Sequence, residues 1–283
     1  MYSTFQLALK YISYYLTSAS GTGRGIHSPF VFDFITKVLN DKKKYEDYNK
    51  VESLRKRSLK ERTILTIEDH GAGSSSASSK ERSVSSIAKH AVKSKKYGQL
   101  LYRMAKYYQA DSIIELGTSL GITTSYLSFA SPKGKVFTLE GSNEVANVAR
   151  QNFKAFGLQR RPDAPRSAEA SLKAQREGIH LIEGNFDYTL PSVLYQVASV
   201  DLAFIDGNHR REPTKNYFHW LLEKANSNSI FVFDDIHWSE DMEQAWEHIK
   251  QHPAARCSID LFFIGIIFFR QEFKEKQHFT IRF

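Results

Sequence analysis

The stretch Ile113-Ile114-Glu115-Leu116-Gly117-Thr118-Ser119-Leu120-Gly121 decides the fold. It has the pattern of a buried strand that enters a glycine-containing turn, and the apolar segment 122–130 that follows has the pattern of a helix. Gly117 lets the backbone turn tightly and lets a ligand approach, and a helix that starts near Gly121 offers free N–H groups to a carboxylate. We therefore predict a strand–turn–helix unit with a ligand at the carboxyl end of the strand.

Short apolar runs and helical segments alternate around this stretch. Strands are predicted at 112–116, 135–139, 179–182, 200–205 and 229–233, with helices at 122–130, 144–156, 213–225 and 241–250. Such alternation is typical of an α/β fold, in which helices cover both faces of a parallel sheet. The last two predicted strands, 259–270 and 279–283, are separated by the short segment 271–277, so at least one late strand should run antiparallel.

The 283 residues divide into two parts near residue 97. Residues 1–96 are expected to form a helical cap or extension, with a flexible loop of glycine, alanine and serine at 71–79. Residues 97–283 are expected to form the α/β domain. A polar segment with two prolines, between 158 and 178, is expected to be an exposed insertion in that domain.

The composition limits which kinds of site, location and partner the protein is expected to have. The single cysteine, Cys257, rules out an intramolecular disulfide and a cysteine-based metal cluster, and it favours a cytoplasmic location. No secretion leader is recognised, and the apolar run 261–269 is too short to span a bilayer as a helix. The net charge of +8 is compatible with an anionic partner such as nucleic acid, but the basic residues are spread along the chain without interleaved aromatics.

Two acids flank the glycine turn in a way that suggests a nucleoside cofactor. Glu115 lies just before the turn, and Glu140 ends the next predicted strand, where a carboxylate can accept hydrogen bonds from both ribose hydroxyls. The dinucleotide fingerprint Gly-x-Gly-x-x-Gly and the phosphate-binding loop that ends in Gly-Lys-Ser/Thr are both absent. The pattern fits a cofactor with a ribose and an amino-acid carboxylate but no phosphate.

Three further acids follow buried strands. Asp206 comes after the apolar run 202–205, and Asp234 and Asp235 end the run 230–233. Carboxylates at neighbouring strand ends can converge, and a divalent cation such as Mg²⁺ would relieve their repulsion. Helix capping is the alternative role for Asp234 and Asp235. His209, three residues after Asp206, is the candidate general base, and His237 is a second candidate.

These motifs resemble the class I S-adenosylmethionine (SAM)-dependent methyltransferases, particularly the branch related to catechol-type O-methyltransferases. The resemblance covers about residues 97–283 and rests on four segments: 115–121, Glu140, 204–209 (Phe-Ile-Asp-Gly-Asn-His) and 233–235 (Phe-Asp-Asp). It implies a Rossmann-like, mostly parallel sheet of seven strands whose last strand is antiparallel.

The resemblance also implies roles for single residues. The methionine end of SAM would contact Glu115, Gly117, Thr118, Ser119 and Gly121, the ribose would contact Glu140 beside Gly141, and the adenine would contact Asn185 and Phe186. Asp206, Asp234 and Asp235 match the metal-ligand positions of the branch, although asparagine is usual at the position of Asp235. Asp206 and His209 match its catalytic positions.

The predicted function is therefore SAM-dependent O-methylation of a small hydroxylated acceptor, with His209 as general base and Mg²⁺ as a candidate metal. The alternatives are a nucleic-acid (RNA) methyltransferase, a nucleotide-cofactor oxidoreductase, and a degenerate fold that serves as a binding module. The Pro-Pro pair of amino-methylating DNA enzymes is absent, and Cys257 follows Arg256 rather than a proline. The aromatic-rich helix predicted at 5–16 is a candidate surface for pairing with a second subunit.

Overall fold

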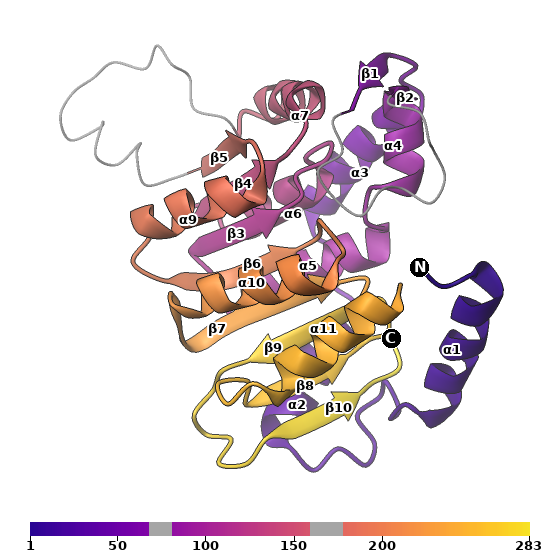
Figure 1. Cartoon of the computed structure of the whole chain (residues 1–283), viewed down its shortest axis with the longest axis vertical. Coiled ribbons are helices and arrows are strands. Elements are labelled where there is room, and N and C mark those ends of the chain that lie inside the picture. The colour runs from indigo at the N-terminus through magenta and orange to yellow at the C-terminus, as the bar shows by residue number, and fades with distance from the viewer. Residues whose placement is uncertain (68–80, 159–177) are drawn as a thin grey trace. The chain divides into compact units, whose positions relative to one another are not determined.

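The structure is a computed structural model that describes residues 1–67, 81–158 and 178–283, and the chain divides into two units (Figure 1). One unit is Lys43–Val193, and the other combines Met1–Lys42 with Leu194–Phe283. The predicted loop 71–79 and nearly all of the predicted insertion lie outside the described residues. The predicted domain boundary near residue 97 stays a prediction. Among the described residues, no helix has the length and hydropathy needed to cross a membrane.

The unit 43–193 is built on three parallel strands in the order β3-β4-β5. These are β3 (Ser112–Leu116), β4 (Lys135–Glu140) and β5 (Gly178–Glu183), and the helices that connect or follow them are α6 (Ile122–Ala130), α7 (Asn143–Ala155) and α9 (Phe186–Gln196). Four elements precede β3 in this unit: α3 (Glu46–Ser58), the hairpin of β1 (Ile64–Thr66) and β2 (Glu81–Ser83), α4 (Val84–His90) and α5 (Lys95–Tyr107). The apolar residues of β3 and β4 are fully or almost fully buried, as expected for parallel strands covered on both faces.

The second unit holds five strands in the order β10-β8-β9-β7-β6. They are β6 (Val200–Ile205), β7 (Ala225–Asp234), β8 (Cys257–Asp260), β9 (Ile264–Phe268) and β10 (Gln277–Thr280), and the helices are α1 (Thr4–Thr17), α2 (Pro29–Phe34), the π-helix η1 (Ile35–Leu39), α10 (Arg211–Leu222) and α11 (Glu240–Gln251). Strand β6 pairs in parallel with β7, and β10 pairs in parallel with β8. Strand β9 runs antiparallel to both of its neighbours, β7 and β8.

The predicted α/β fold with a mostly parallel sheet and a late antiparallel strand is confirmed, and two details are corrected. Apart from the hairpin of β1 and β2, the described residues form eight strands rather than seven, three in one unit and five in the other. The antiparallel strand is β9, whereas the last strand, β10, is parallel to its neighbour. The strand predicted at 259–270 is in fact a hairpin that turns at 261–263, where Phe262 has a φ of +69° and is buried. Because this turn carries leucine and phenylalanine instead of glycine, proline or asparagine, the sequence pattern hides it.

The N-terminal segment folds onto the second unit. Helix α1 begins with a capping box, in which Ser3 accepts a hydrogen bond from the Gln6 amide and the Gln6 side chain accepts one from the Ser3 amide. The chain then forms a parallel bridge between Ala19 and Ile281, with hydrogen bonds from the Ala19 amide to Thr280 and from the Arg282 amide to Ala19. Helix α2 packs on β9 through the edge-on contact of Phe34 with Phe268.

Candidate active site

The turn between β3 and α6 has the backbone that its glycines predict. Gly117 and Gly121 have φ values of +103° and +75°, a region that favours glycine. The amides of Gly117 and Thr118 both donate to the Leu139 carbonyl, which ties the turn to the end of β4. Gly121 is the N-cap of α6, and no side chain in the described part of the chain caps the first turn of that helix. The amides of the first turn of α6 are therefore suited to an anionic group.

Gly121 also sits where no side chain fits. A Cβ atom there would lie 2.6 Å from Phe153 Cζ, in addition to the strain of a positive φ. We expect Gly121→Ala to lower the free energy of unfolding by about 1–3 kcal/mol, as measured by urea denaturation. Gly157→Ala is the matched control, because Gly157 has a φ of +67° but open space at its Cβ position. Equal losses in the two variants would mean that backbone strain alone, and not contact with Phe153, requires the glycine.

Glu115 is a buried acid, and only one of its two carboxylate oxygens has hydrogen-bond partners among the described residues. Its Oε2 accepts hydrogen bonds from the hydroxyls of Thr124 (2.5 Å) and Thr138 (2.6 Å), whereas its Oε1 has no hydrogen-bond partner among the described residues. Burial raises the pKa of Glu115 to about 7, and the two threonine hydroxyls oppose that rise. A buried acceptor without a partner is costly, so Oε1 is suited to a donor that a ligand supplies.

Glu140 is held by two backbone amides at the end of β4. Its Oε2 accepts from the Ser119 amide (2.9 Å), and its Oε1 accepts from the Ser142 amide (3.0 Å). The buried hydroxyls of Ser119 and Ser142 have no hydrogen-bond partner in the described ranges. Sequence reasoning missed Ser142, since a serine before a helix resembles an ordinary N-cap. The carboxylate and these hydroxyls form a polar group at the strand end.

Asn185 and Phe186 lie where β5 ends and α9 begins. The Asn185 side chain accepts a hydrogen bond from the Asp187 amide (2.8 Å), as a helix cap does, and Phe186 is half-buried. Gly141 follows Glu140 directly, before α7 begins. The predicted contacts of these residues with a cofactor stay predictions.

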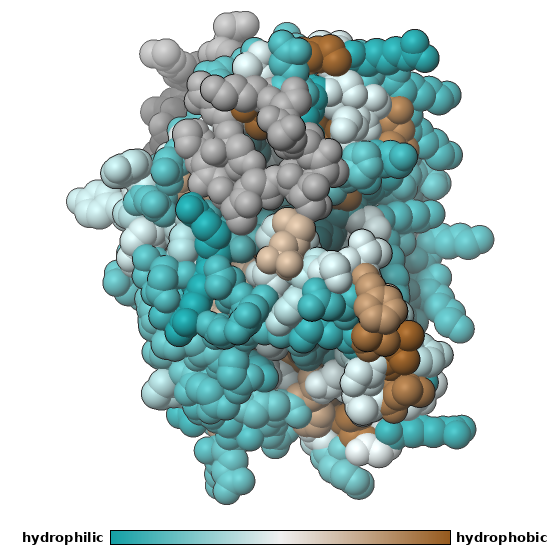
Figure 2. All heavy atoms as spheres, turned by 45° about the vertical axis from the view of Figure 1, so that its right-hand side comes forward, coloured by the Kyte–Doolittle hydropathy of each residue, from teal (hydrophilic) through white to brown (hydrophobic). Residues whose placement is uncertain are grey.

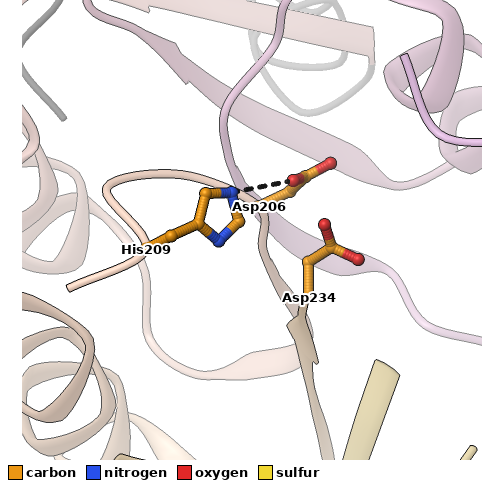
Figure 3. Close-up of side chains that lie close together, drawn as sticks. All are labelled: Asp206, His209 and Asp234. Carbon is orange, nitrogen blue, oxygen red and sulfur yellow. Dashed lines mark ion pairs between the residues drawn. The ribbon is translucent and has the colours of Figure 1, made fainter. Parts of the chain in front are cut away.

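The other unit brings three predicted residues together at the carboxyl ends of β6 and β7. Ile205 and Phe233 are register partners, so Asp206 and Asp234 follow them at the same edge of the sheet. One ligand atom each from Asp206, His209 and Asp234 lie within 4.8 Å of one another. Figure 3 shows the imidazole of His209 directed at Asp206, with His209 Nε2 3.6 Å from Asp206 Oδ1. Two carboxylates and one imidazole are a donor set that suits a divalent cation.

The loop that carries His209 is fixed by its own side chains. Asn208 has a φ of +63°, and its side-chain Nδ2 donates to the Tyr217 hydroxyl (2.8 Å) on α10. Arg210 Nε in turn donates to the side-chain Oδ1 of Asn208 (2.6 Å). The ring of Trp238 lies 5.7 Å from the ring of His209. These contacts set the position of His209 beside the two aspartates.

Asp235 and His237 are placed differently from the three grouped residues. Asp235 has a φ of +52° and donates its amide to the Phe263 carbonyl (2.7 Å), and it lies outside the group that could hold a metal. His237 uses both ring nitrogens, with Nδ1 2.9 Å from Glu243 and Nε2 2.8 Å from Asp260. Burial alone would lower the pKa of His237, but these two carboxylates outweigh it and raise the pKa. His237 is thus suited to a structural role, and the metal-ligand role of Asp235 stays a prediction.

The chain is similar in sequence to known methyltransferases. Residues 114–236 match a family model described as "Methyltransferase domain". A catechol O-methyltransferase from Niastella koreensis is 28% identical over 141 residues, which cover 49% of this chain and 55% of that protein. A catechol O-methyltransferase from Mycobacterium tuberculosis is 29% identical over 140 residues, which cover 49% of this chain and 54% of that protein. The chain thus spans about half the length of the curated relatives it matches.

Solved structures share the fold over most of the chain. An SAH-bound methyltransferase from Podospora anserina has a TM-score of 0.56 at 14% identity, covering 86% of this chain and 97% of that chain. An O-methyltransferase from Bacillus cereus in complex with SAH has a TM-score of 0.50 at 17% identity, covering 84% and 97%. At sequence identities this low, the similarity to these structures shows a shared fold only. The chain is thus similar in sequence to a methyltransferase domain, over residues 114–236, and to catechol O-methyltransferases, and it shares its fold with solved methyltransferases.

Proposed function

We propose that this protein transfers a methyl group from SAM to the oxygen of a small hydroxylated acceptor. The grouping of Asp206, His209 and Asp234 at adjacent strand ends carries this proposal, because it combines a candidate cation site with a candidate base. The relatives in sequence are catechol O-methyltransferases, which supports a hydroxyl as the acceptor group. A cytoplasmic location is part of the same proposal, supported by a single cysteine that is buried and free.

The residues of β3 and β4 fit the methionine and ribose parts of SAM. Glu115 Oε1, which has no hydrogen-bond partner among the described residues, would accept a hydrogen bond from the cofactor's ammonium group, and the amides of the first turn of α6 would face its carboxylate. Glu140 has lone pairs left for ribose hydroxyls after accepting its two amide hydrogen bonds, and the hydroxyls of Ser119 and Ser142 can add to them. Asn185 and Phe186 are proposed for the adenine.

Asp206, Asp234 and His209 supply the chemistry on the acceptor side. Asp206 and Asp234 would hold a Mg²⁺ ion, which when bound lowers the pKa of an acceptor hydroxyl. His209 Nε2 would accept the proton that the hydroxyl loses as its oxygen bonds to the methyl carbon, while the electron pair of the breaking bond stays on sulfur. Asp206 would orient the imidazole and stabilise its protonated form. Holding the two reactants in line supplies much of the acceleration.

Cofactor binding tests the proposal before any acceptor is known. We expect Glu140→Gln to weaken SAM affinity in isothermal titration calorimetry by about a hundredfold, because hydrogen bonds to a charged group contribute about 1.5–3 kcal/mol each. Glu183→Gln is the matched control, since Glu183 ends the neighbouring strand in register with Glu140 but is ion-paired with Arg150. Folded wild-type protein that binds neither SAM nor SAH would favour the binding module instead.

His209 is tested by turnover on an acceptor found by screening hydroxylated small molecules. We expect His209→Gln to lower kcat by about a hundredfold or more while SAM affinity stays unchanged, because only proton transfer is lost. Full turnover in this variant would exclude His209 as the base. RNA that competes with the small acceptor, with binding that weakens steeply as salt rises, would favour the nucleic-acid alternative.

A further inference from the structure

The outward face of α1 is a stripe of large apolar side chains. Phe5, Leu9, Ile12 and Leu16 are 71%, 51%, 54% and 73% exposed. Their spacing of four, three and four residues places them on one side of the helix. Figure 2 shows hydrophobic side chains gathered along the side of the molecule on which α1 lies. A single exposed leucine is ordinary, but a contiguous stripe indicates a binding surface.

The opposite face of α1 is firmly attached to its own unit. Lys10 forms an ion pair with Glu243 (2.9 Å), and Glu243 also accepts a hydrogen bond from the Tyr2 hydroxyl (2.7 Å). The hydroxyl of Tyr14, a buried residue, donates to the Ile281 carbonyl. The ring of Tyr11 packs edge-on against Phe262, with 5.0 Å between centroids. The helix is therefore fixed on one face while the apolar stripe points away from the unit.

We propose that α1 pairs with α1 of a second copy of this chain, so that the protein is a homodimer. A spacing of four, three and four residues is the a/d repeat of a coiled coil, with Leu9 and Leu16 at a and with Phe5 and Ile12 at d. The flanking e and g positions are Gln6, Ala8, Ser13 and Tyr15, none of which is charged. Like charges at those positions would oppose pairing of identical helices, and here there are none.

The charge distribution of α1 also favours a second copy over a membrane surface. Lys10 is the only charged residue between Thr4 and Thr17, and it is paired with Glu243 on the inner face. Helices that lie on membranes carry lysine and arginine along their polar border. Phe263, which is 43% exposed and has its ring 6.0 Å from that of Tyr11, extends the apolar surface beyond the helix. A two-fold dimer would use this same surface on both copies.

The mass of the full chain in solution tests the proposal. Light scattering on the purified protein is expected to give twice the chain mass of 32.5 kDa. The double variants Leu9→Lys/Ile12→Lys and Leu9→Glu/Ile12→Glu are each expected to be monomeric, because like charges then meet across the seam. A mixture of the two variants is expected to restore the dimer through opposite charges. Tyr195→Lys, at a 91% exposed aromatic on α9, is the control that keeps the dimer.

Three results would overturn the proposal. The first is a monomeric wild type at about 100 μM, since a stable interface would be populated there. The second is a failure of the two charge variants to pair when they are mixed, although each is monomeric by light scattering and folded by circular dichroism. The third is a monomer that binds anionic phospholipid vesicles through Leu9 and Ile12, which would assign the stripe to a membrane. The milder Leu16→Gln is expected to weaken the dimer several-fold, so the test does not depend on the double variants folding.

Discussion

Asp234→Asn is expected to slow methyl transfer about a thousandfold and to leave SAM affinity unchanged. Asp234 is buried at the end of β7, and it shares the candidate cation site with Asp206 and His209. Asparagine keeps the shape of the side chain but removes a charge that a divalent cation requires. A metal that polarises the acceptor oxygen contributes several kcal/mol, and each 1.36 kcal/mol is worth about tenfold in rate.

Two measurements distinguish metal binding by Asp234 from a role of this residue without a metal. Mn²⁺ binding, followed by electron paramagnetic resonance on the protein without acceptor, is expected to disappear in Asp234→Asn. Turnover of the wild type is expected to fall on chelation and to return with Mg²⁺. Asp241→Asn is the control, because Asp241 is an exposed acid in the first turn of α11. Wild-type turnover that survives chelation, together with absent Mn²⁺ binding, would leave His209 as the sole acid–base group and exclude the metal.

Glu115→Gln is expected to remove a pH dependence of stability that the wild type shows without ligand. Burial raises the pKa of Glu115 to about 7 in the folded protein, whereas the unfolded carboxyl titrates near its ordinary pKa of 4.5. The folded state therefore binds more protons between these values, and the free energy of unfolding falls as the pH rises from 4.5 to 7. The full stabilisation is present below pH 4.5 and is lost above about pH 7, and it amounts to about 3 kcal/mol.

Urea denaturation at a series of pH values between 5 and 8 measures this effect. Glutamine is neutral throughout the range, so the variant should lose the falling slope, while Glu240→Gln, at an exposed acid, should keep it. SAM should reduce the slope in the wild type, because its ammonium group would stabilise the charged carboxylate. A wild type whose unfolding free energy is constant over this range would mean that Glu115 is charged when folded, and that its second oxygen has a partner.

The parts of the site that the sequence predicts are those where an apolar strand ends in a polar residue. Glu115 lies one residue before the end of β3, and Glu140 ends β4. In the other unit, Asp206 follows β6 and Asp234 ends β7, and the carboxyl ends of adjacent parallel strands lie at the same edge. The pairing of β6 with β7 brings Asp206 and Asp234 together for this reason. The helix α6 has the predicted bounds, since a glycine in a left-handed conformation marks its start.

Other features depend on contacts between distant residues, which no local pattern reveals. The hairpin of β8 and β9 turns on apolar residues because Phe262 packs against Tyr11 and His237, which lie far from it in the sequence. His237 was the second candidate base on sequence, after His209, and only its two carboxylate partners show that both of its ring nitrogens are used. Helix α9, with Pro191 inside it, was likewise not predicted.

The bridge between Ala19 and Ile281 has a consequence for the order in which the protein is made. One unit, Lys43–Val193, is a single continuous segment, so it can fold as it leaves the ribosome. The other unit cannot be completed before both 1–42 and 194–283 are present, and the bridge between Ala19 and Ile281 closes a loop of more than 250 residues. Such a high contact order makes folding slow. The N-terminal segment that carries the apolar stripe therefore stays without its native partner strands until residues 194–283 have been translated.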